Sequence, residues 1–517
     1  MEECPIEVKN LFYQIFLRIK LKVENQRILR YDSVRFCFMA GLECRSRGGI
    51  AVILEGIDYA RILKKALRNG GDFADIFAER SSPLSIIYDD DRVEKVISGL
   101  DSGAGVRVVF GSRTAYAYTN DVTLPSLLEL ADAVSRAVQA GSDGATRDIV
   151  INLSKKRATV DYHIRKPPEN VATSRKVGIV TSANRAARSI DRRIRQVSVT
   201  YRENRQQVLI AHSDGFMAED ERMYLTAVVH VVAAEGDVVQ TGYEPIGGFM
   251  GMELFDLSPL EQAAETAARR GVMMLSARKS PAGRMPVVLS AEAGGTMIHE
   301  AVGHGLEADL AQSGLSVYSG KIGRQIAAPL ITVIDDATIP GKRGSFRFDD
   351  EGTGAERTVL VEKGVLKTFM YDRLTAMKDG ARSTGNGRRE SYKHRPIPRM
   401  TNTMIAPGAS DPDEILRSTP KGLFVKKMGG GQVNTVNGDF VFEVSEGYLI
   451  EQGKLGEPVR GATLTGNGPQ VLMSIDRVGS DIGFSIGTCG KDGQGSPVSD
   501  AQPTLRIPEL TVGGEVV

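Results

Sequence analysis

The chain has 517 residues and a net charge of +1, with 41% hydrophobic and 25% charged residues. This length exceeds one typical hydrophobic core and predicts two or three domains. A near-neutral chain lacks the basic excess of nucleic-acid-binding proteins, so no direct nucleic-acid contact is expected. No apolar run approaches the ~18 residues that cross a bilayer, and four cysteines do not make a disulfide framework. We therefore expect a cytoplasmic protein without a membrane segment.

The first 52 residues are unlike the rest of the chain. Residues 11–23 have the pattern of an amphipathic helix or strand, and three of the four cysteines (Cys4, Cys37 and Cys44) lie in this segment. We assign it no chemistry. Residues 1–52 are predicted to be a divergent extension, either poorly ordered or the product of an upstream start codon.

Residues 53–275 have the pattern of an N-terminal α+β domain. Apolar runs bounded by turn residues predict strands, and longer runs with helical spacing predict helices. The prolines of Lys166-Pro-Pro-Glu169 indicate a linker, so a break near 142–168 would divide this domain into two subdomains. The expected strands include 73–79, 85–88, 92–98, 115–118, 195–203, 207–212 and 221–234, and the expected helices are 58–68, 124–140, 170–189 and 259–275.

The most informative stretch is His299-Glu-Ala-Val-Gly-His304, which follows a predicted buried strand at 285–289. The chain has six histidines, and two of them fall in this short window with a glutamate beside the first. Neutral imidazole is a good zinc ligand, and a carboxylate next to the metal can accept a proton from water. The alternative is an ordinary helix that carries two histidines.

The spacing of these histidines differs from His-Glu-x-x-His, in which four-residue spacing places both imidazoles on one helix face. A five-residue spacing leaves roughly 140° between the side chains of a regular α-helix. A local π-type widening, with i→i+5 pairing, would bring them onto one face. Gly303 and Gly305 flank His304 and would let the helix loosen or end there. We therefore predict a distorted helix at 299–304.

Cys489 lies among glycines, far from the other three cysteines. A thiolate is a strong zinc ligand and would complete a three-ligand site whose fourth position is left for water. The alternative is a buried small hydrophobic residue. The polar, glycine-rich surroundings favour a metal ligand.

Residues 382–403 form a long cationic stretch rich in turn-forming residues. Long loops of this kind are often functional or disordered. Its polar side chains are of the kinds that hold a peptide backbone or an oxyanion, although a solvated loop is the alternative. The candidate substrate-binding residues are Arg388, Tyr392, His394 and Asn402.

Two other polar features receive no functional role. The acidic, glycine-rich stretch 349–354 lacks a full set of alternating oxygen ligands for Ca²⁺, so we interpret it as an exposed turn. His212 and His230 lie within predicted strands and are interpreted as ordinary strand residues.

Four motifs together resemble those of the TldD/PmbA family of zinc metallopeptidases. They are His299-Glu-Ala-Val-Gly-His304, Ser383-Thr-Gly-Asn-Gly-Arg-Arg-Glu-Ser-Tyr392, Pro398-Arg-Met-Thr-Asn-Thr403 and Cys489-Gly-Lys-x-Gly-Gln-x-x-Pro-Val498. The resemblance runs from about residue 55 to the C-terminus. It implies an N-terminal α/β portion with antiparallel strands and helices, followed by a mainly-β catalytic domain at 276–517 with a metal-binding helix. TldD-type chains carry the metal motif and PmbA (TldE)-type partners lack it, so this chain resembles the TldD type.

The resemblance implies His299, His304 and Cys489 as Zn²⁺ ligands and Glu300 as the general base. It implies hydrolysis of unfolded or short peptides within a dimer cavity. The partner would be a PmbA/TldE-type chain in a heterodimer, or a second copy in a homodimer. Zinc would polarise the scissile carbonyl, and Glu300 would take a proton from water and pass it to the leaving amine. We expect the peptide to add as an extended strand.

Two other functions compete with this one. The family has also been described as a modulator of DNA gyrase, so a non-enzymatic regulatory or binding protein is the first alternative. A general base at Glu300 and a thiol at Cys489 favour an enzyme, because a scaffold needs neither. The second alternative is a zinc amidase that acts on a small molecule, but the sequence has no obvious small-ligand motif.

Overall fold

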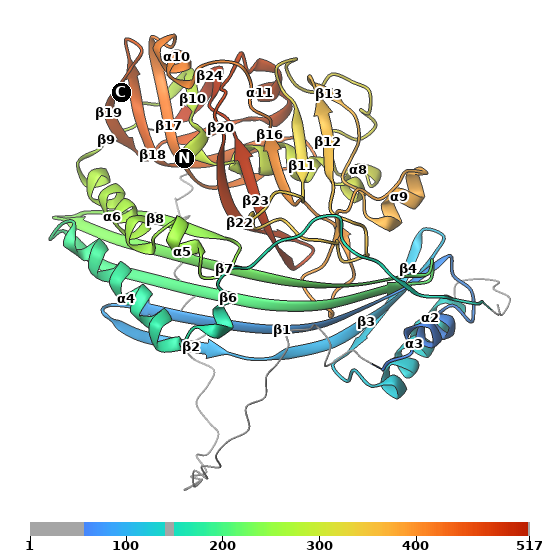
Figure 1. Cartoon of the computed structure of the whole chain (residues 1–517). Coiled ribbons are helices and arrows are strands. Elements are labelled where there is room, and N and C mark those ends of the chain that lie inside the picture. The colour runs from blue at the N-terminus through green and yellow to red at the C-terminus, as the bar shows by residue number, and fades with distance from the viewer. Residues whose placement is uncertain (1–55, 140–148, 515–517) are drawn as a thin grey trace, which may run out of the picture. The chain divides into compact units, whose positions relative to one another are not determined.

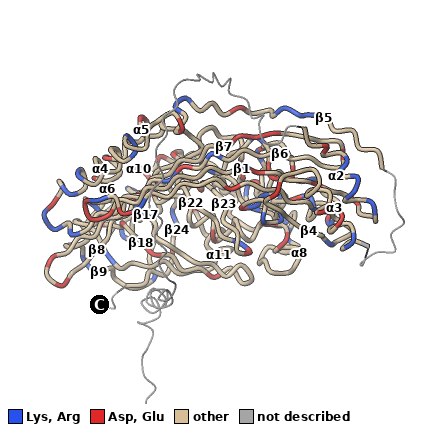
Figure 2. The backbone as a smooth tube through the Cα atoms, turned by 90° about the horizontal axis from the view of Figure 1, so that it is seen from below, with Lys and Arg blue, Asp and Glu red and all other residues tan. Residues whose placement is uncertain are grey.

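The computed structural model describes residues 56–139 and 149–514. These residues belong to one compact unit. The predicted extension at 1–52, and residues 142–148 of the predicted break, lie outside the described residues. Within the two described ranges, every helix is too short or too polar to cross a membrane. Cationic and acidic residues are interspersed along the described backbone (Figure 2).

The N-terminal half of the described chain builds an eight-stranded sheet with the order β4-β3-β1-β6-β7-β5, in which β2 also pairs with β1 and β8 with β7. Its centre consists of three long antiparallel strands, β1 (Phe73–Asp89), β6 (Ile194–His212) and β7 (Phe216–Glu235). The shorter strands are β2 (Arg92–Ser98), β3 (Asp101–Phe110), β4 (Arg113–Thr119), β5 (Ser154–Lys155) and β8 (Val238–Phe249).

Strands β1 and β6 each join two segments that the sequence predicted as separate strands. The polar stretches 80–83 and 204–206 interrupt the apolar alternation, which suggested strand ends. In the structure both stretches remain paired, with Pro83 opposite Asn204. Most of their side chains are half-buried or exposed rather than packed in the core. The prediction that each strand ends at its polar stretch was therefore wrong. Both strands continue through these stretches, whose side chains lie largely outside the apolar core.

Two pairs of helices lie toward opposite ends of the long strands (Figure 1). Helix α2 packs against α3, and α4 packs against α6. Alanines 263, 264, 267 and 268 of α6 join the buried valines of β6 and β7 in one apolar cluster, and such small side chains let a helix lie close to a sheet. The bounds are α2 (Tyr59–Ala66), α3 (Leu124–Gln139), α4 (Thr173–Ser189), α5 (Leu254–Leu257) and α6 (Leu260–Ser276).

In the C-terminal half, the described strands form two larger sheets. The first has the order β17-β10-β24-β20-β18-β19-β9, with β21 also paired to β24, and the second has the order β13-β12-β11-β16-β23-β22. The first sheet consists of β9 (Arg278–Lys279), β10 (Gly283–Leu289), β17 (Lys421–Val433), β18 (Asp439–Glu451), β19 (Lys454–Arg460), β20 (Thr463–Asn467), β21 (Arg477–Val478) and β24 (Leu505–Gly513). The second consists of β11 (Val333–Asp336), β12 (Arg357–Glu362), β13 (Val365–Leu366), β16 (Asn402–Ile405), β22 (Gly483–Lys491) and β23 (Gln494–Gln502).

The histidine motif begins at α7 (Thr296–Ile298), which contacts strands of both sheets, β17 of the first and β16 and β23 of the second. Met297, Ile298 and Val302 are buried in the apolar core that both sheets share. The remaining C-terminal helices are α8 (Ala308–Gln312), α9 (Arg373–Asp379), α10 (Pro412–Arg417) and α11 (Gly468–Ser474). The predicted α+β class is confirmed, with a mainly-β C-terminal half around a motif helix.

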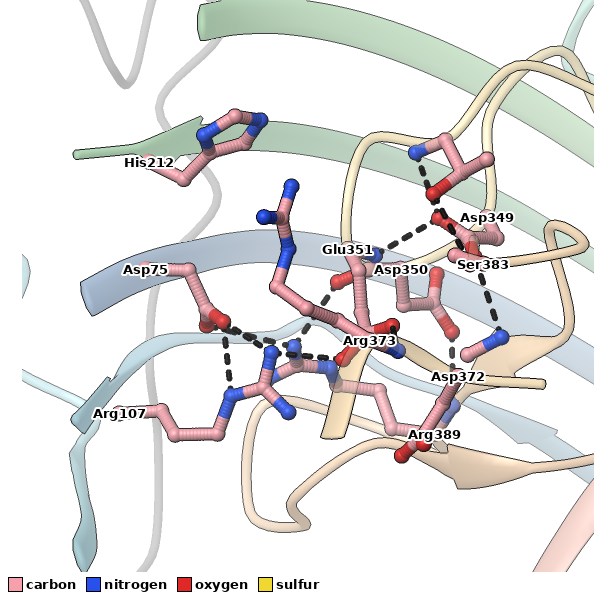
Figure 3. Close-up of polar contacts among 12 residues, drawn as sticks. Asp75, Arg107, His212, Asp349, Asp350, Glu351, Asp372, Arg373, Ser383 and Arg389 are labelled. Carbon is pink, nitrogen blue, oxygen red and sulfur yellow. Dashed lines mark hydrogen bonds and ion pairs between the residues drawn. The ribbon is translucent and has the colours of Figure 1, made fainter. Parts of the chain in front are cut away.

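The acidic stretch predicted to be an exposed turn is instead buried. Asp349, Asp350 and Glu351 are at most 2% exposed, and they lie against β1 and β3 of the N-terminal sheet (Figure 3). Arg107 forms ion pairs with Asp75 and with Glu351, the latter at 2.6 Å. Buried carboxylates require such partners, so this acidic stretch joins the two halves of the described chain.

Candidate active site

The histidine motif forms a π-helical turn, which confirms the predicted distortion. The π turn spans His299–Gly303 and is followed by a 3₁₀ turn at His304–Leu306. The backbone N–H of His304 donates to the carbonyl oxygen of His299, which is the i→i+5 bond of a π-helix. The two imidazole rings consequently lie with centroids 5.0 Å apart and planes at 88°.

The π turn ends at Gly303 and a short 3₁₀ turn follows, as predicted, although Gly303 itself keeps a helical φ of −55° and ψ of −54°. A Cβ atom at this position would lie 2.1 Å from Sδ of Met400. Glycine is therefore needed because Met400 packs directly against the π turn.

Cys489 comes to the two histidines from the β22–β23 hairpin, where it lies opposite Ser496. Its Sγ is 3.5 Å from Nε2 of His304. The ligand atoms of His299, His304 and Cys489 all lie within 4.8 Å of one another, and no other group of this kind occurs among the residues that the structure describes. The three residues that the sequence selected as metal ligands thus meet in space.

A buried carboxylate holds the second nitrogen of each imidazole. Nδ1 of His299 lies 2.6 Å from Oδ1 of Asp500, and Nδ1 of His304 lies 2.9 Å from Oε2 of Glu307. Lys491 in turn pairs with Glu307 at 3.2 Å. Such pairs fix the ring orientation and the tautomer, and leave Nε2 available as a ligand. The sequence reasoning assigned no role to Asp500, Glu307 or Lys491.

The charges around Cys489 favour its thiolate. Burial opposes ionisation of the thiol, but hydrogen bonds from His299 and His304 outweigh it and lower the pKa of Cys489 to about 5. Burial likewise opposes protonation of His304, but Glu307 and Cys489 raise its pKa to about 10. Zinc sites are commonly built from a thiolate and imidazoles. A divalent ion that binds here can displace the proton from the ligand nitrogen of each imidazole.

The three candidate ligands and Glu300 line one cleft of about 630 Å³. Burial raises the pKa of Glu300, while His299 and His304 oppose this rise. The cleft also receives side chains from the N-terminal sheet, including His230 of β7 and Tyr243 of β8. His230 was interpreted as an ordinary strand residue, and nothing in its local sequence distinguishes it from His212.

The four candidates in the 382–403 loop are absent from the described residues that line this cleft. Arg388 is buried and donates to the carbonyl oxygens of Met400 and Pro497. Tyr392 is held by Glu79 and Asp101 of the N-terminal sheet. The other two have local partners, Ser391 for His394 and Asp336 and Ser345 for Asn402. Their contact with substrate stays a prediction.

The 382–403 loop contacts the hairpin that carries Cys489. Arg399 of this loop is fully buried, which contradicts the alternative expectation of a solvated loop. Its guanidinium donates to the carbonyl oxygens of Cys489 and Gln494, one on each strand of the β22–β23 hairpin. Arg399 is thus a positioning residue for Cys489, and it was not among the candidates chosen from the sequence. Its one sequence signal is its place in the motif Pro398-Arg-Met-Thr-Asn-Thr403.

Comparisons with known proteins match this architecture along the chain. Family models of the PmbA/TldA metallopeptidase match in order: domain 1 at residues 74–141, the central domain at 166–275 and the C-terminal domain at 282–514. The chain belongs to the PmbA/TldD metallopeptidase family. The resemblance seen in the four sequence motifs is thereby confirmed.

Relatives of the family carry metalloprotease names. A "Metalloprotease TldD homolog" of Haemophilus influenzae is 39% identical over 86% of this chain and 93% of its own length. A "Zinc metalloprotease TldD homolog" of Saccharolobus solfataricus is 29% identical over 88% of this chain and 100% of its own length. These names support a metallopeptidase.

Solved structures share the fold at low sequence identity. TldE of Thermococcus kodakarensis superposes with a TM-score of 0.70 at 17% identity, covering 88% of this chain and 99% of that chain. A Thermotoga maritima protein named as a modulator of a DNA gyrase gives 0.71 at 20% identity, covering 85% and 96%. At these identities the likeness concerns the fold alone.

Proposed function

We propose that the chain is a zinc-dependent peptidase in which His299, His304 and Cys489 hold the metal. The observation that carries this proposal is the convergence of their ligand atoms within 4.8 Å, in the same cleft as Glu300. Two imidazoles and a thiolate suit zinc and leave a fourth position for water or substrate. The low pKa of Cys489 and the carboxylates at both Nδ1 atoms fit the same ion.

In this proposal Glu300 acts as the general base. Zinc bound in the site would supply a Lewis acid for the scissile carbonyl and would lower the pKa of water. Glu300 would accept the proton of the attacking water and return it to the leaving amine. Burial raises its pKa, which moves the carboxyl group toward the range in which it can both accept and donate a proton near neutral pH.

The substrates that we propose are unfolded or short peptides. Strand β22 is the last strand in its sheet order, and its residues 485–490 line the cleft. An extended peptide could pair with this edge, and main-chain pairing tolerates many side chains. N-methylation of single backbone amides in a cleaved peptide should then slow cleavage more than replacement of the neighbouring side chains. Equal sensitivity to every side-chain replacement would refute this mode of binding.

We further propose a dimer that encloses the cleft, with a PmbA/TldE-type partner or with a second copy of this chain. One solved neighbour is itself named TldE, which supports a family in which both chain types occur. The low cysteine content supports a reducing, cytoplasmic location. Size-exclusion chromatography with light scattering, with and without a TldE-type chain, tests the partner. A chain that remains monomeric in both would contradict it.

The test of the peptidase proposal is cleavage of an unfolded protein and of short peptides by the zinc-loaded full chain, alone and with a TldE-type partner. We expect Glu300→Gln to retain zinc and to lose about 100-fold or more in rate. The matched control is Glu292→Gln, at an exposed residue four positions before the start of α7, and it should cleave like the wild type.

The outcomes separate the competing functions. Full cleavage by Glu300→Gln would contradict the role of Glu300. Biological activity that survives without any cleavage would favour a regulatory protein, and turnover of simple amides but not of peptides would favour an amidase.

A further inference from the structure

A second cavity of about 420 Å³ adjoins the metal cleft, and Thr488 lines both. Its walls come from the polar middle of β1 and β6, from Arg388–Glu390 of the long loop, and from the β22–β23 hairpin. Thr488 directly precedes Cys489 on β22. One residue that lines the cavity is therefore the chain neighbour of a candidate metal ligand, with Cα atoms about 3.8 Å apart.

The acidic residues of this cavity already have partners. Five arginines (Arg202, Arg222, Arg343, Arg388 and Arg389) and three acids (Glu203, Asp350 and Glu390) line it. Glu203 accepts from Lys176 at 2.7 Å, and Asp350 accepts from Arg222 at 2.7 Å. Glu390 accepts from the backbone N–H of Gly495. Each acid thus has a partner, and for Asp350 and Glu390 that partner lies in the wall of the same cavity.

Three of the arginines have no carboxylate partner within the described part of the chain. Arg343 donates to the carbonyl oxygen of Gly487 at 3.1 Å and to Oγ1 of Thr488 at 3.0 Å. Arg388 donates to the carbonyl oxygens of Met400 and Pro497. Arg202 is exposed on β6.

The electrostatic environment of these cations favours binding of an anionic group. Burial lowers the pKa of Arg343 and of Arg388, and neighbouring arginines add to this effect. Tyr224 opposes the shift at both residues and Asp350 opposes it at Arg388, but the pKa of each guanidinium remains lowered. A buried guanidinium is costly unless it is paired. Arg202 and Arg388 also repel Arg343, as their effect on its pKa indicates. An anionic group placed among the three would relieve both the desolvation and the repulsion.

We propose that this cavity binds a carboxylate of the peptide substrate, from an aspartate or glutamate side chain or from the peptide's C-terminus. The inference rests on the proposed peptidase function and names a substrate preference for it. Arg343 is hydrogen-bonded to the strand that carries Cys489, so a peptide along β22 presents a carboxylate to the cavity close to the cleaved bond. The preference for a carboxylate applies to one position of the peptide, and the residues at its other positions are not restricted.

The test is peptide binding, which requires no turnover. Zinc-loaded full-length Glu300→Gln protein is titrated with three labelled peptides: a glutamate peptide amide, its glutamine analogue as an amide, and that analogue as a free acid. Fluorescence anisotropy gives each Kd. The same measurements follow in Arg343→Gln and in Arg202→Gln. Arg195→Gln, an exposed arginine on the same strand as Arg202 that lies outside the residues lining the cavity, is the matched control.

We expect one of the two acidic peptides to bind about tenfold more tightly than the neutral amide, as a charge-assisted hydrogen bond allows. Tighter binding of the glutamate peptide amide identifies a side-chain carboxylate as the ligand, and tighter binding of the free-acid peptide identifies the C-terminal carboxylate. Arg343→Gln and Arg202→Gln should each reduce the difference, and Arg195→Gln should retain it.

Similar affinities for all three peptides, or no measurable affinity, would overturn the inference, as would a difference that survives in both cavity variants. Failure of the peptidase proposal would instead appear as absence of cleavage by the wild-type chain, whatever the Kd values are.

Discussion

Nδ1 of His299 lies 2.6 Å from Oδ1 of Asp500, although 201 positions separate the two residues in the sequence. Asp500 belongs to β23, which pairs with the strand that carries Cys489. One hairpin therefore delivers both the thiol and the carboxylate that orients the first imidazole. The metal site depends on this hairpin as much as on the π turn.

Asp500→Asn should weaken zinc binding by about 10–100-fold, the usual loss when the partner of a ligating histidine is removed. Competition against a chromophoric zinc chelator measures this affinity. Asp492→Asn, in the exposed turn of the same hairpin, is the control and should bind zinc like the wild type. Equal affinity of the Asp500 variant and the wild type would show that His299 is oriented by other contacts.

Gly295→Ala should disturb the same contact sterically. A Cβ atom at Gly295 would lie 2.4 Å from the backbone nitrogen of Ala501 and 2.5 Å from the carbonyl carbon of Asp500. We expect a loss of about 1–3 kcal/mol in stability, together with weaker zinc binding. Gly178→Ala, in helix α4 with open space around it, should instead be neutral or slightly stabilising. Thermal unfolding and chelator competition check both variants, and a Gly295 variant that matches the wild type in both would contradict the account.

The buried acidic cluster of Figure 3 predicts a dependence of stability on pH. Burial, and then the charge of Glu351, raise the pKa of Asp372 to about 7. Because this pKa exceeds the unfolded value, the stability contributed by the protonated group is complete below about pH 4 and is lost as pH rises through about 7.

Asp372→Asn should therefore flatten the decline of Tm between about pH 5 and 8 by a few degrees. Asparagine can still cap α9 through its side-chain oxygen. Metal-free protein is used for these scans so that zinc binding does not contribute. Parallel Tm profiles for the variant and the wild type would show that Asp372 does not titrate in this range.

Much of the candidate site could be predicted from local sequence. The π turn followed from one geometric argument, because two imidazoles five residues apart can share a metal only if the helix widens. Cys489 was identified from its glycine-rich surroundings. Asp500 could not be assigned, because no spacing rule links a carboxylate on one strand to an imidazole on a distant helix. Glu307 was overlooked although it lies only three residues after His304, a spacing at which helical side chains meet.

The wrong predictions about the fold also result from contacts between residues far apart in the sequence. The acidic, glycine-rich stretch 349–354 was predicted to be an exposed turn, but the ion pair of Glu351 with Arg107 of the distant β3 makes the burial of its acidic residues possible. The polar middles of β1 and β6 suggested strand ends because they lack core residues. Pro83 of β1, and Asn204 and Gln206 of β6, line the arginine-lined cavity. The alternation of apolar residues therefore fails there for a reason that only the assembled sheet reveals.

The most direct test of the central claim is the zinc content of the full chain purified without added metal, for the wild type and for Cys489→Ala side by side. We expect about one zinc per wild-type chain, as in sites with three protein ligands, and loss or strong weakening of binding in the variant. Elemental analysis with zinc titration measures both. A wild-type chain that neither contains nor takes up zinc, or a Cys489→Ala variant that binds it equally well, would contradict the His299, His304 and Cys489 site.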